Sequence, residues 1–304
     1  MGVWIDADMG FDDVVAIEIV HNSSLTIDGL GLVVGNSTMD NVVRTAANAS
    51  AALGWDFPIT KGRTKSVLGR IDTAVDALGA TGIRSAGREF PTQSDALPDD
   101  AFQRLCAYLE GEGPHRILAL GPLTNIAALV LARPDLAARI TDITWMGGSL
   151  TGGNITPHAE FNAYSDPEAL AIVLAHDLPF RMVDLDFCRR VQVDHGFVPA
   201  VREAGGTHAH TLADYLSAYV DISLGQGHRG AAVYDAVAAL SFIRDDLVSF
   251  ASAQVTADIS LGEKRGCTTA NLSELVSNAE VAVDMDPETV KRLIVDAVVK
   301  AARR

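Results

Sequence analysis

Four aspartates lie within eight positions near the start of the chain, in the stretch DADMGFDD at residues 6–13. Carboxylates packed this closely repel one another, and some of them stay protonated unless a positive group neutralises them. The turn therefore predicts either a bound cation or a reaction that uses paired carboxylates.

Three interpretations of this acidic turn compete. Helix capping would employ Asp12 or Asp13 near a helix N-terminus, but it leaves Asp6 and Asp8 without a role. A phosphoryl-transfer site of the haloacid-dehalogenase type would use the DxD after a first strand together with magnesium. Such sites carry Thr or Val where Gly10 stands. A calcium site would need six to eight oxygen ligands, which carboxylates and backbone carbonyls supply, and it could hold a water against one aspartate.

Short apolar runs alternate with longer helix-like segments along the chain. This pattern predicts an α/β fold with a mostly parallel, Rossmann-like central sheet flanked by helices. In open sheets of this kind ligands bind at the carboxyl ends of the strands, so the active site is expected there. Strands are expected at 2–5, 25–36, from 116, at 140–149, at 179–186 and within 250–285, with helices at about 12–20, 42–53, 165–177, 192–227 and 287–304. Segment 62–100 is expected to form long loops.

The composition narrows the class of protein. A single domain over residues 1–304 is expected, and the net charge of −15 argues against a nucleic-acid or anionic-membrane surface. The sequence has no run of 18 apolar residues and no basic-then-apolar leader, which favours a cytoplasmic protein without a membrane partner. Three cysteines without CxxC spacing are typical of reduced thiols.

The acidic turn belongs to a larger pattern. DADMGFDDVVAI resembles the DTDPGxDDxxAI signature of the nucleoside hydrolases, the inosine-uridine-preferring family. Five further elements similar to family motifs follow in order: VVGN (33–36), LGPLTNIA (120–127), MGG (146–148), NITPHAEFNAYSDPEA (154–169) and VYDAVAA (233–239). Six elements in order over nearly the whole chain are specific, whereas a lone DxDxxxDD is not.

The resemblance implies an enzyme that hydrolyses the N-glycosidic bond of ribonucleosides and depends on Ca²⁺. Asp8 would be the general base, activating a metal-bound water. The calcium ligands would be Asp8, Asp13, Asp235 and the backbone carbonyl of Leu120. The substrate-binding residues would be Asp12, Asn36, Met146, Asn154, Glu160, Phe161, Asn162, Tyr234 and His228. For Asn36, Asn154 and Phe161, plain turn, loop or core roles stay open, as do helix capping for Asp235 and a solvated loop for His228.

The sequence departs from the family at the base-binding end. The family's final motif reads His-Asp-Pro, whereas this chain has Tyr234, Asp235 and Ala236. Leu78 replaces a second histidine, and Met9 replaces the proline of the first motif. Tyr234 would stack on a purine or modified base, or its hydroxyl would donate to that base. The chain is thus an atypical member, and a role in purine salvage follows.

Two other functions remain as alternatives. One is a nucleoside- or ribose-binding protein that keeps the metal site but catalyses weakly, although such a protein would not need Asp8. The other is a metal-dependent phosphatase. The resemblance also implies a homodimer or homotetramer.

Overall fold

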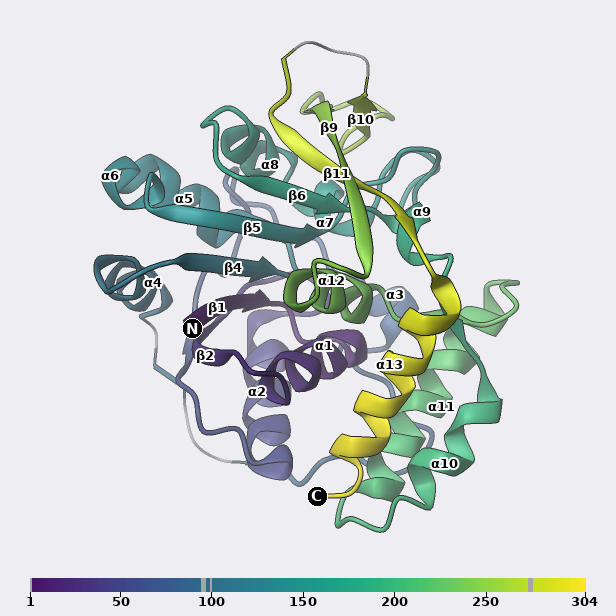
Figure 1. Ribbon diagram of the computed structural model, residues 1–304. Coiled ribbons are helices and arrows are strands. Elements are labelled where there is room, and N and C mark those ends of the chain that lie inside the picture. Colours follow the sequence, from purple (N-terminus) through teal and green to yellow (C-terminus); the bar gives the residue numbers. More distant parts are fainter. Residues whose placement is uncertain (1, 94–96, 99, 273–275) are drawn as a thin grey trace.

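The computed structural model describes residues 2–93, 97–98, 100–272 and 276–304 (Figure 1). A nine-stranded sheet runs through this described part, in the order β10-β9-β11-β6-β5-β4-β1-β2-β3. Its strands are β1 (Gly2–Ala7), β2 (Thr26–Leu32), β3 (Ile59–Lys61), β4 (His115–Ala119), β5 (Ile140–Met146), β6 (Phe180–Val183), β9 (Val248–Ala257), β10 (Thr268–Asn271) and β11 (Ala279–Met285). Short β7 (Gln192–Val193) and β8 (Ala231–Ala232) pair separately.

Most neighbouring strands run parallel. All pairs from β3 across to β11 are parallel, and only β9 against β11 and β10 against β9 are antiparallel. The predicted α/β class with a mostly parallel central sheet is therefore confirmed. Strand β10 lies within the segment 250–285 that was expected to form strands, whereas the three-residue strand β3 was not predicted, because ITK is too short to show apolar alternation.

Helices cover both faces of the sheet (Figure 1). The longer ones are α1 (Phe11–His21), α2 (Met39–Leu53), α4 (Ala101–Glu110), α5 (Thr124–Ala132), α8 (Pro167–Leu174), α11 (Ala209–Gly225), α12 (Tyr234–Ile243) and α13 (Pro287–Ala301). The shorter ones are α3 (Val75–Leu78), α6 (Pro134–Ala137), α7 (Phe161–Ser165), α9 (Leu185–Cys188), α10 (Val198–Arg202) and the 3₁₀ turn η1 (His195–Phe197). Helix α4 was not expected, and the segment 192–227, which was expected to be helical, also contains the short strand β7.

Two apolar cores lie on opposite faces of the sheet. Alternating side chains of β1 divide between them, since Val3 and Ile5 belong to the core with α1, α2, α11, α12 and α13, whereas Trp4 belongs to the core with α4, α5 and α8. Successive side chains of a strand point to opposite faces, so one short strand stabilises both layers. Strand β1 is thereby fixed from both sides, and the acidic turn begins where it ends.

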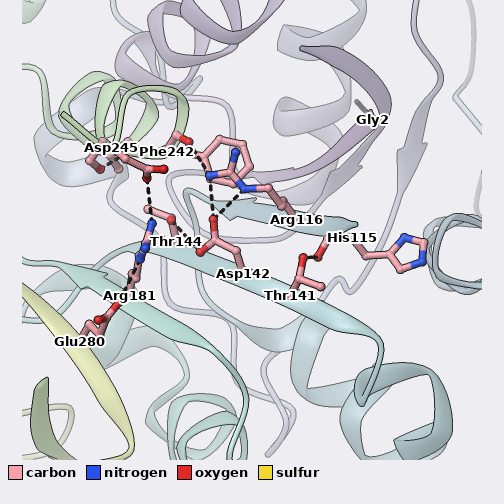
Figure 2. A network of polar contacts seen from close by, with 12 residues as sticks. Gly2, His115, Arg116, Thr141, Asp142, Thr144, Arg181, Phe242, Asp245 and Glu280 are labelled. Carbon is pink, nitrogen blue, oxygen red and sulfur yellow. Dashed lines mark hydrogen bonds and ion pairs between the residues drawn. The ribbon is translucent and has the colours of Figure 1, made fainter. Parts of the chain in front are cut away.

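A network of polar contacts binds the C-terminal end of α12 (Figure 2). The Arg116 guanidinium donates to Asp142 at 2.8 Å and to the carbonyl of Phe242 at 2.5 Å, and it lies 4.2 Å from the Phe242 ring centroid. A cation at a helix C-terminus satisfies carbonyls that have no partner within the helix. Since α12 begins at Tyr234 and Asp235, this anchor sets where those two residues stand.

Several boundaries differ from the sequence-based expectation. The strand expected to reach Asn36 ends at Leu32, and residues 33–38 form turns. The strands expected at 140–149 and 179–186 end at Met146 and Val183. Loops prevail in segment 62–100, where α3 is the one described helix; residues 94–96 and 99 lie outside the described residues.

Candidate active site

The acidic turn connects β1 to α1 and is folded tightly on itself. The backbone N–H of Gly10 donates to Asp13 Oδ2 at 2.7 Å, and the N–H of Asp8 donates to Asp13 Oδ1 at 3.2 Å. Asp13 is fully buried, and it uses both oxygens to close the turn. Met9, between them, has a φ of 61°, which L side chains rarely adopt.

Asp8 is held by one residue from the next strand-to-helix connection. The backbone N–H of Asn36 donates to Asp8 Oδ2 and its side-chain amide donates to Asp8 Oδ1, both at 2.7 Å. The two residues are 28 positions apart in sequence, yet they meet because β1 and β2 are parallel neighbours whose carboxyl ends share one edge. Asn36 therefore fixes the orientation of the Asp8 carboxylate.

In the described part of the chain, three carboxylates lie close enough together to hold one metal ion. One oxygen from each of Asp12, Asp13 and Asp235 lies within 4.8 Å of the others. Asp12 and Asp13 stand in the first turn of α1, and Asp235 stands in the first turn of α12. Two helix N-termini thus converge on this group, where their dipoles favour negative charge.

Burial raises the pKa of every aspartate in this group. It raises the pKa of Asp12 to about 6 and that of Asp13 to about 7, with the charge of Asp12 adding to the second shift. The pKa values of Asp8 and Asp235 rise well above their ordinary value for the same reason, with neighbouring aspartates as the next cause. Buried carboxylates in such proximity fit a hard divalent cation, which takes oxygen ligands and removes the repulsion.

A cavity of about 530 Å³ opens in front of these carboxylates. It is lined by the predicted site residues Asp8, Asp12, Asn36, Leu120, Met146, Asn154, Glu160, Phe161, Asn162, His228, Tyr234 and Asp235. Asp13 does not line it and lies behind Asp8 and Asp12. The cavity sits at the carboxyl edge of β1, β2, β4 and β5, the edge at which the sequence placed the site.

Some predicted substrate-binding groups also serve the local fold. Glu160 caps α7, with its two oxygens accepting from the backbone N–H groups of Gly148, Asn162 and Ala163 at 2.8 to 3.1 Å. The side-chain amide of Asn162 donates to the carbonyls of Leu120 at 2.9 Å and Met146 at 3.0 Å. The Leu120 carbonyl keeps a second lone pair, so this bond leaves it able to bind a cation.

Tyr219 and Arg189 are among the cavity-lining residues that the sequence did not predict. Tyr219 of α11 places its hydroxyl 3.0 Å from Asp12 Oδ2 and 2.8 Å from the carbonyl of Ala232. Arg189 follows α9 and faces Tyr234 across the cavity wall. Neither residue lies in a family-like motif, and no local signal in the sequence marks them.

A hollow of about 600 Å³ at the opposite edge of the sheet has no comparable chemistry. Most of its charged groups are paired with one another, as in the contacts of Arg181 with Glu280 and of Arg116 with Asp142 (Figure 2). We therefore assign the chemistry to the cavity with the aspartates.

Replacing Met9 by Pro is expected to destabilise the protein by about 3 kcal/mol, because proline holds φ near −65° and cannot adopt the observed positive value. Met9→Leu is the control, since it keeps the backbone and a similar volume and costs less than about 1.5 kcal/mol. Urea unfolding of both variants checks this. A Met9→Pro variant as stable as the wild type would show that the turn has a different backbone.

Comparisons with known proteins agree with this fold and site. A family model described as inosine-uridine preferring nucleoside hydrolase matches residues 3–292, and the chain belongs to that family. A pyrimidine-specific ribonucleoside hydrolase from Enterobacter sp. (strain 638) is 28% identical over 289 residues, which are 93% of this chain and 92% of that protein.

Solved structures show the same architecture. A plant nucleoside hydrolase is similar with a TM-score of 0.89 at 27% identity, covering 98% of each chain. A purine-preferring ribonucleoside hydrolase from Gardnerella vaginalis reaches a TM-score of 0.90 at 23% identity, covering 100% of this chain and 99% of that one. At this identity the likeness shows a shared fold and nothing further. The predicted family and the prediction of a nucleoside hydrolase are confirmed. Among the described residues, none of the helices is both long and apolar enough to cross a bilayer.

Proposed function

We propose that this nucleoside hydrolase is calcium-dependent, cleaves ribonucleosides to ribose and free base, and prefers purine or modified bases. The observation that carries the proposal is the placement of Asp8. It faces the cavity beside three clustered carboxylates, and Asn36 fixes both of its oxygens. A nucleoside-binding protein would have no need for a carboxylate held in this way.

The acidic residues fit a calcium ion. We propose Asp8, Asp13, Asp235 and the Leu120 carbonyl as its ligands, with Asp12 close by. The group of three carboxylates whose oxygens lie within 4.8 Å of one another contains Asp12 rather than Asp8. Asp12 is therefore a further candidate ligand. A bound calcium ion would neutralise these carboxylates and lower the pKa of a water that it coordinates.

The chain's own side chains would perform the remaining steps. Asp8 would take a proton from the attacking water as general base. Asp12 would accept from the ribose 2′-hydroxyl, while Asn36 and Asn162 would orient the sugar. As the base departs, positive charge develops on the ribose, and the surrounding carboxylate and amide oxygens would stabilise it electrostatically. Asn154, Glu160, Met146 and Phe161 would complete the sugar site.

The base would lie near Tyr234, whose ring lines the cavity at the start of α12. A ring at this position can stack on a purine, which offers a larger face than a pyrimidine. His228 lines the same end of the cavity from the loop after α11. The purine preference rests on Tyr234, and the pyrimidine-specific relative is the reason to test both classes.

The test is release of free ribose from a panel of purine and pyrimidine nucleosides, with and without a calcium chelator. We expect release from purine nucleosides that the chelator abolishes and added calcium restores. Release from pyrimidine nucleosides alone would overturn the stacking role of Tyr234 and keep the hydrolase. Calcium-dependent nucleoside binding without release would favour the binding-protein alternative, and phosphate release from phosphomonoesters would favour the phosphatase.

The assembly is also a proposal. A homodimer or homotetramer follows from the family, and sedimentation velocity of the full chain tests it. A monomer at micromolar concentration would contradict it.

A further inference from the structure

We infer that Arg189 binds the leaving base and stabilises the negative charge that the base acquires, which makes it a specificity determinant for bases with an oxo group, the 6-oxopurines among purines. This inference deepens the proposed hydrolase function and rests on it. Neither of the family's histidines stands at the base-binding end of this chain, so the stabilising group has to come from elsewhere.

The position of Arg189 follows from its contacts. It comes directly after α9, its backbone N–H donates to the carbonyl of Leu185, and it lines the cavity together with Tyr234. The adjacent Cys188 thiol lies 3.6 Å from the carbonyl of Tyr234, which ties this turn to the first residue of α12. The guanidinium interacts with the Tyr234 hydroxyl, so the two side chains share one end of the cavity.

Several N–H groups of the Arg189 guanidinium remain available for hydrogen bonds with a ligand. Its nearest carboxylate is Asp186, at 3.6 Å, beyond hydrogen-bond distance. The oxygen of Asp186 that faces Arg189 is Oδ1, whereas Oδ2 accepts from the Ser149 hydroxyl and from the N–H groups of Leu150 and Thr151. Arg189 Nε is buried and finds no acceptor among the described residues. Among the described residues the guanidinium contacts Tyr234 and Asp186, which leaves several of its five N–H donors for a ligand carbonyl.

The charge of the cavity points to the same role. Its charged lining residues are Asp8, Asp12, Asp76, Glu160, Asp235 and Arg189, with His228 as a further group that can be protonated. Arg189 is thus the one permanently cationic side chain on this wall in the described part of the chain. The carboxylates suit the sugar, which becomes positive, and the arginine suits the base, which becomes negative.

The chemistry balances without another reactant. The bond between the anomeric carbon and the base nitrogen breaks, and its electron pair goes to the base. The water oxygen bonds to the anomeric carbon and its proton goes to Asp8, while the base takes a proton from solvent after release. A guanidinium only donates hydrogen bonds, so it stabilises a base whose delocalised charge rests on a ring oxo group. The 6-amino group of adenine offers it no acceptor.

The test compares Arg189→Met with Arg189→Lys and with the control Arg190→Met. Arg190 is an exposed neighbour whose guanidinium contacts Val283 and Asp284, so its loss removes the same charge outside the cavity. We expect Arg189→Met to lower kcat/KM for inosine by about 30-fold or more and to lower the ratio of inosine to adenosine turnover. For 4-nitrophenyl β-D-riboside, kcat/KM should stay within about threefold of the wild-type value. That leaving group needs little stabilisation. Arg189→Lys would recover part of the loss for inosine, and Arg190→Met would leave kcat/KM unchanged for both substrates.

Binding provides a second readout that does not depend on turnover. In the Asp8→Asn background, adding Arg189→Met is expected to weaken inosine binding about 10-fold by calorimetry, whereas adding Arg190→Met leaves it unchanged. Equal loss of inosine and nitrophenyl riboside hydrolysis, or inosine binding unaffected by Arg189→Met, would overturn the role of Arg189 alone. Absence of both hydrolysis and binding in the wild type would overturn the proposed function and this inference together.

Discussion

The Asp8→Asn variant is expected to hydrolyse nucleosides about 10²- to 10⁴-fold more slowly than the wild type, because it lacks the general base. The loss should appear mainly in kcat, since the amide still occupies the same position. Steady-state kinetics on the best nucleoside of the panel measure it at saturating calcium. A variant with wild-type kcat would show that another group accepts the proton.

Folding of Asp8→Asn has to be separated from catalysis. Both donors on Asp8 come from Asn36, and an asparagine at position 8 can accept only one of them, so one hydrogen bond is lost at a cost of about 1 to 3 kcal/mol. Relief of repulsion within the acidic group offsets part of that cost. Thermal unfolding of the variant should therefore stay close to that of the wild type.

Asp6→Asn is the matched control for that variant. Asp6 stands two residues earlier and is equally buried, and it accepts from Trp4 Nε1 at 3.1 Å and Asn125 Nδ2 at 2.9 Å. Its replacement also leaves one donor unmatched, but on the opposite face of the sheet and outside the cavity. We expect a similar change in stability and less than about a 10-fold change in activity. If Asp6→Asn lost as much activity as Asp8→Asn, the loss in both variants would be due to a disturbed fold of the acidic turn.

Calcium is expected to raise the thermal stability of the protein, and the increase should be larger at pH 8 than at pH 5.5. Metal-free carboxylates of the site have pKa values of about 6 for Asp12 and about 7 for Asp13 in the folded state, above the value of 3.8 that unfolding restores. Between pH 3.8 and 7 the folded state therefore binds more protons than the unfolded one. Stability of the metal-free protein falls as the pH rises through this window.

Calcium acts in the opposite sense over the same range. It binds the ionised carboxylates, so its stabilising effect grows as they lose protons and as its own affinity rises. Calorimetric scans with calcium or chelator at several pH values measure both trends. A calcium effect that does not change between pH 5.5 and 8 would place the ion away from these aspartates.

Asp235→Asn provides the control for the calcium prediction. It removes one carboxylate from the group without touching the acidic turn, so the calcium-induced increase in melting temperature should largely disappear. The metal-free variant should be at least as stable as the metal-free wild type at pH 8, because one buried charge is gone. A full calcium effect in this variant would exclude Asp235 as a ligand.

The sequence predicted the catalytic edge of the site better than its base-binding end. Asp8 and Asn36 could be placed together because each follows a strand of a parallel sheet, and strand ends meet at one edge whatever the loops do. Arg189 and Tyr219 could not be found in this way. They reach the cavity through the packing of α9 and α11, and helix packing depends on contacts between distant segments that no local pattern records.

The roles of single residues were also harder to predict than their location. Glu160 was expected to hold the sugar, and its carboxylate already accepts from two backbone N–H groups at the start of α7 and from the N–H of Gly148 after β5. Asp166 caps α8, accepting from the N–H of Ala169. Helix capping depends on neighbouring residues, so it can be predicted from the sequence. Whether the same carboxylate also binds a ligand depends on which distant residues and which cavity it faces.

The order of strands has a consequence for how the enzyme is made. Strand β11 lies between β6 and β9, although the ribosome delivers it after both (Figure 1). Until residues 279–285 emerge, the edge of β6 is unpaired and the β9–β10 hairpin has no strand to join, a state prone to aggregation. Helix α13, which packs against α1, arrives later still. A nascent chain that already carries every residue proposed for the active site thus remains unfinished, and truncations before residue 279 should yield insoluble protein rather than a weakened enzyme.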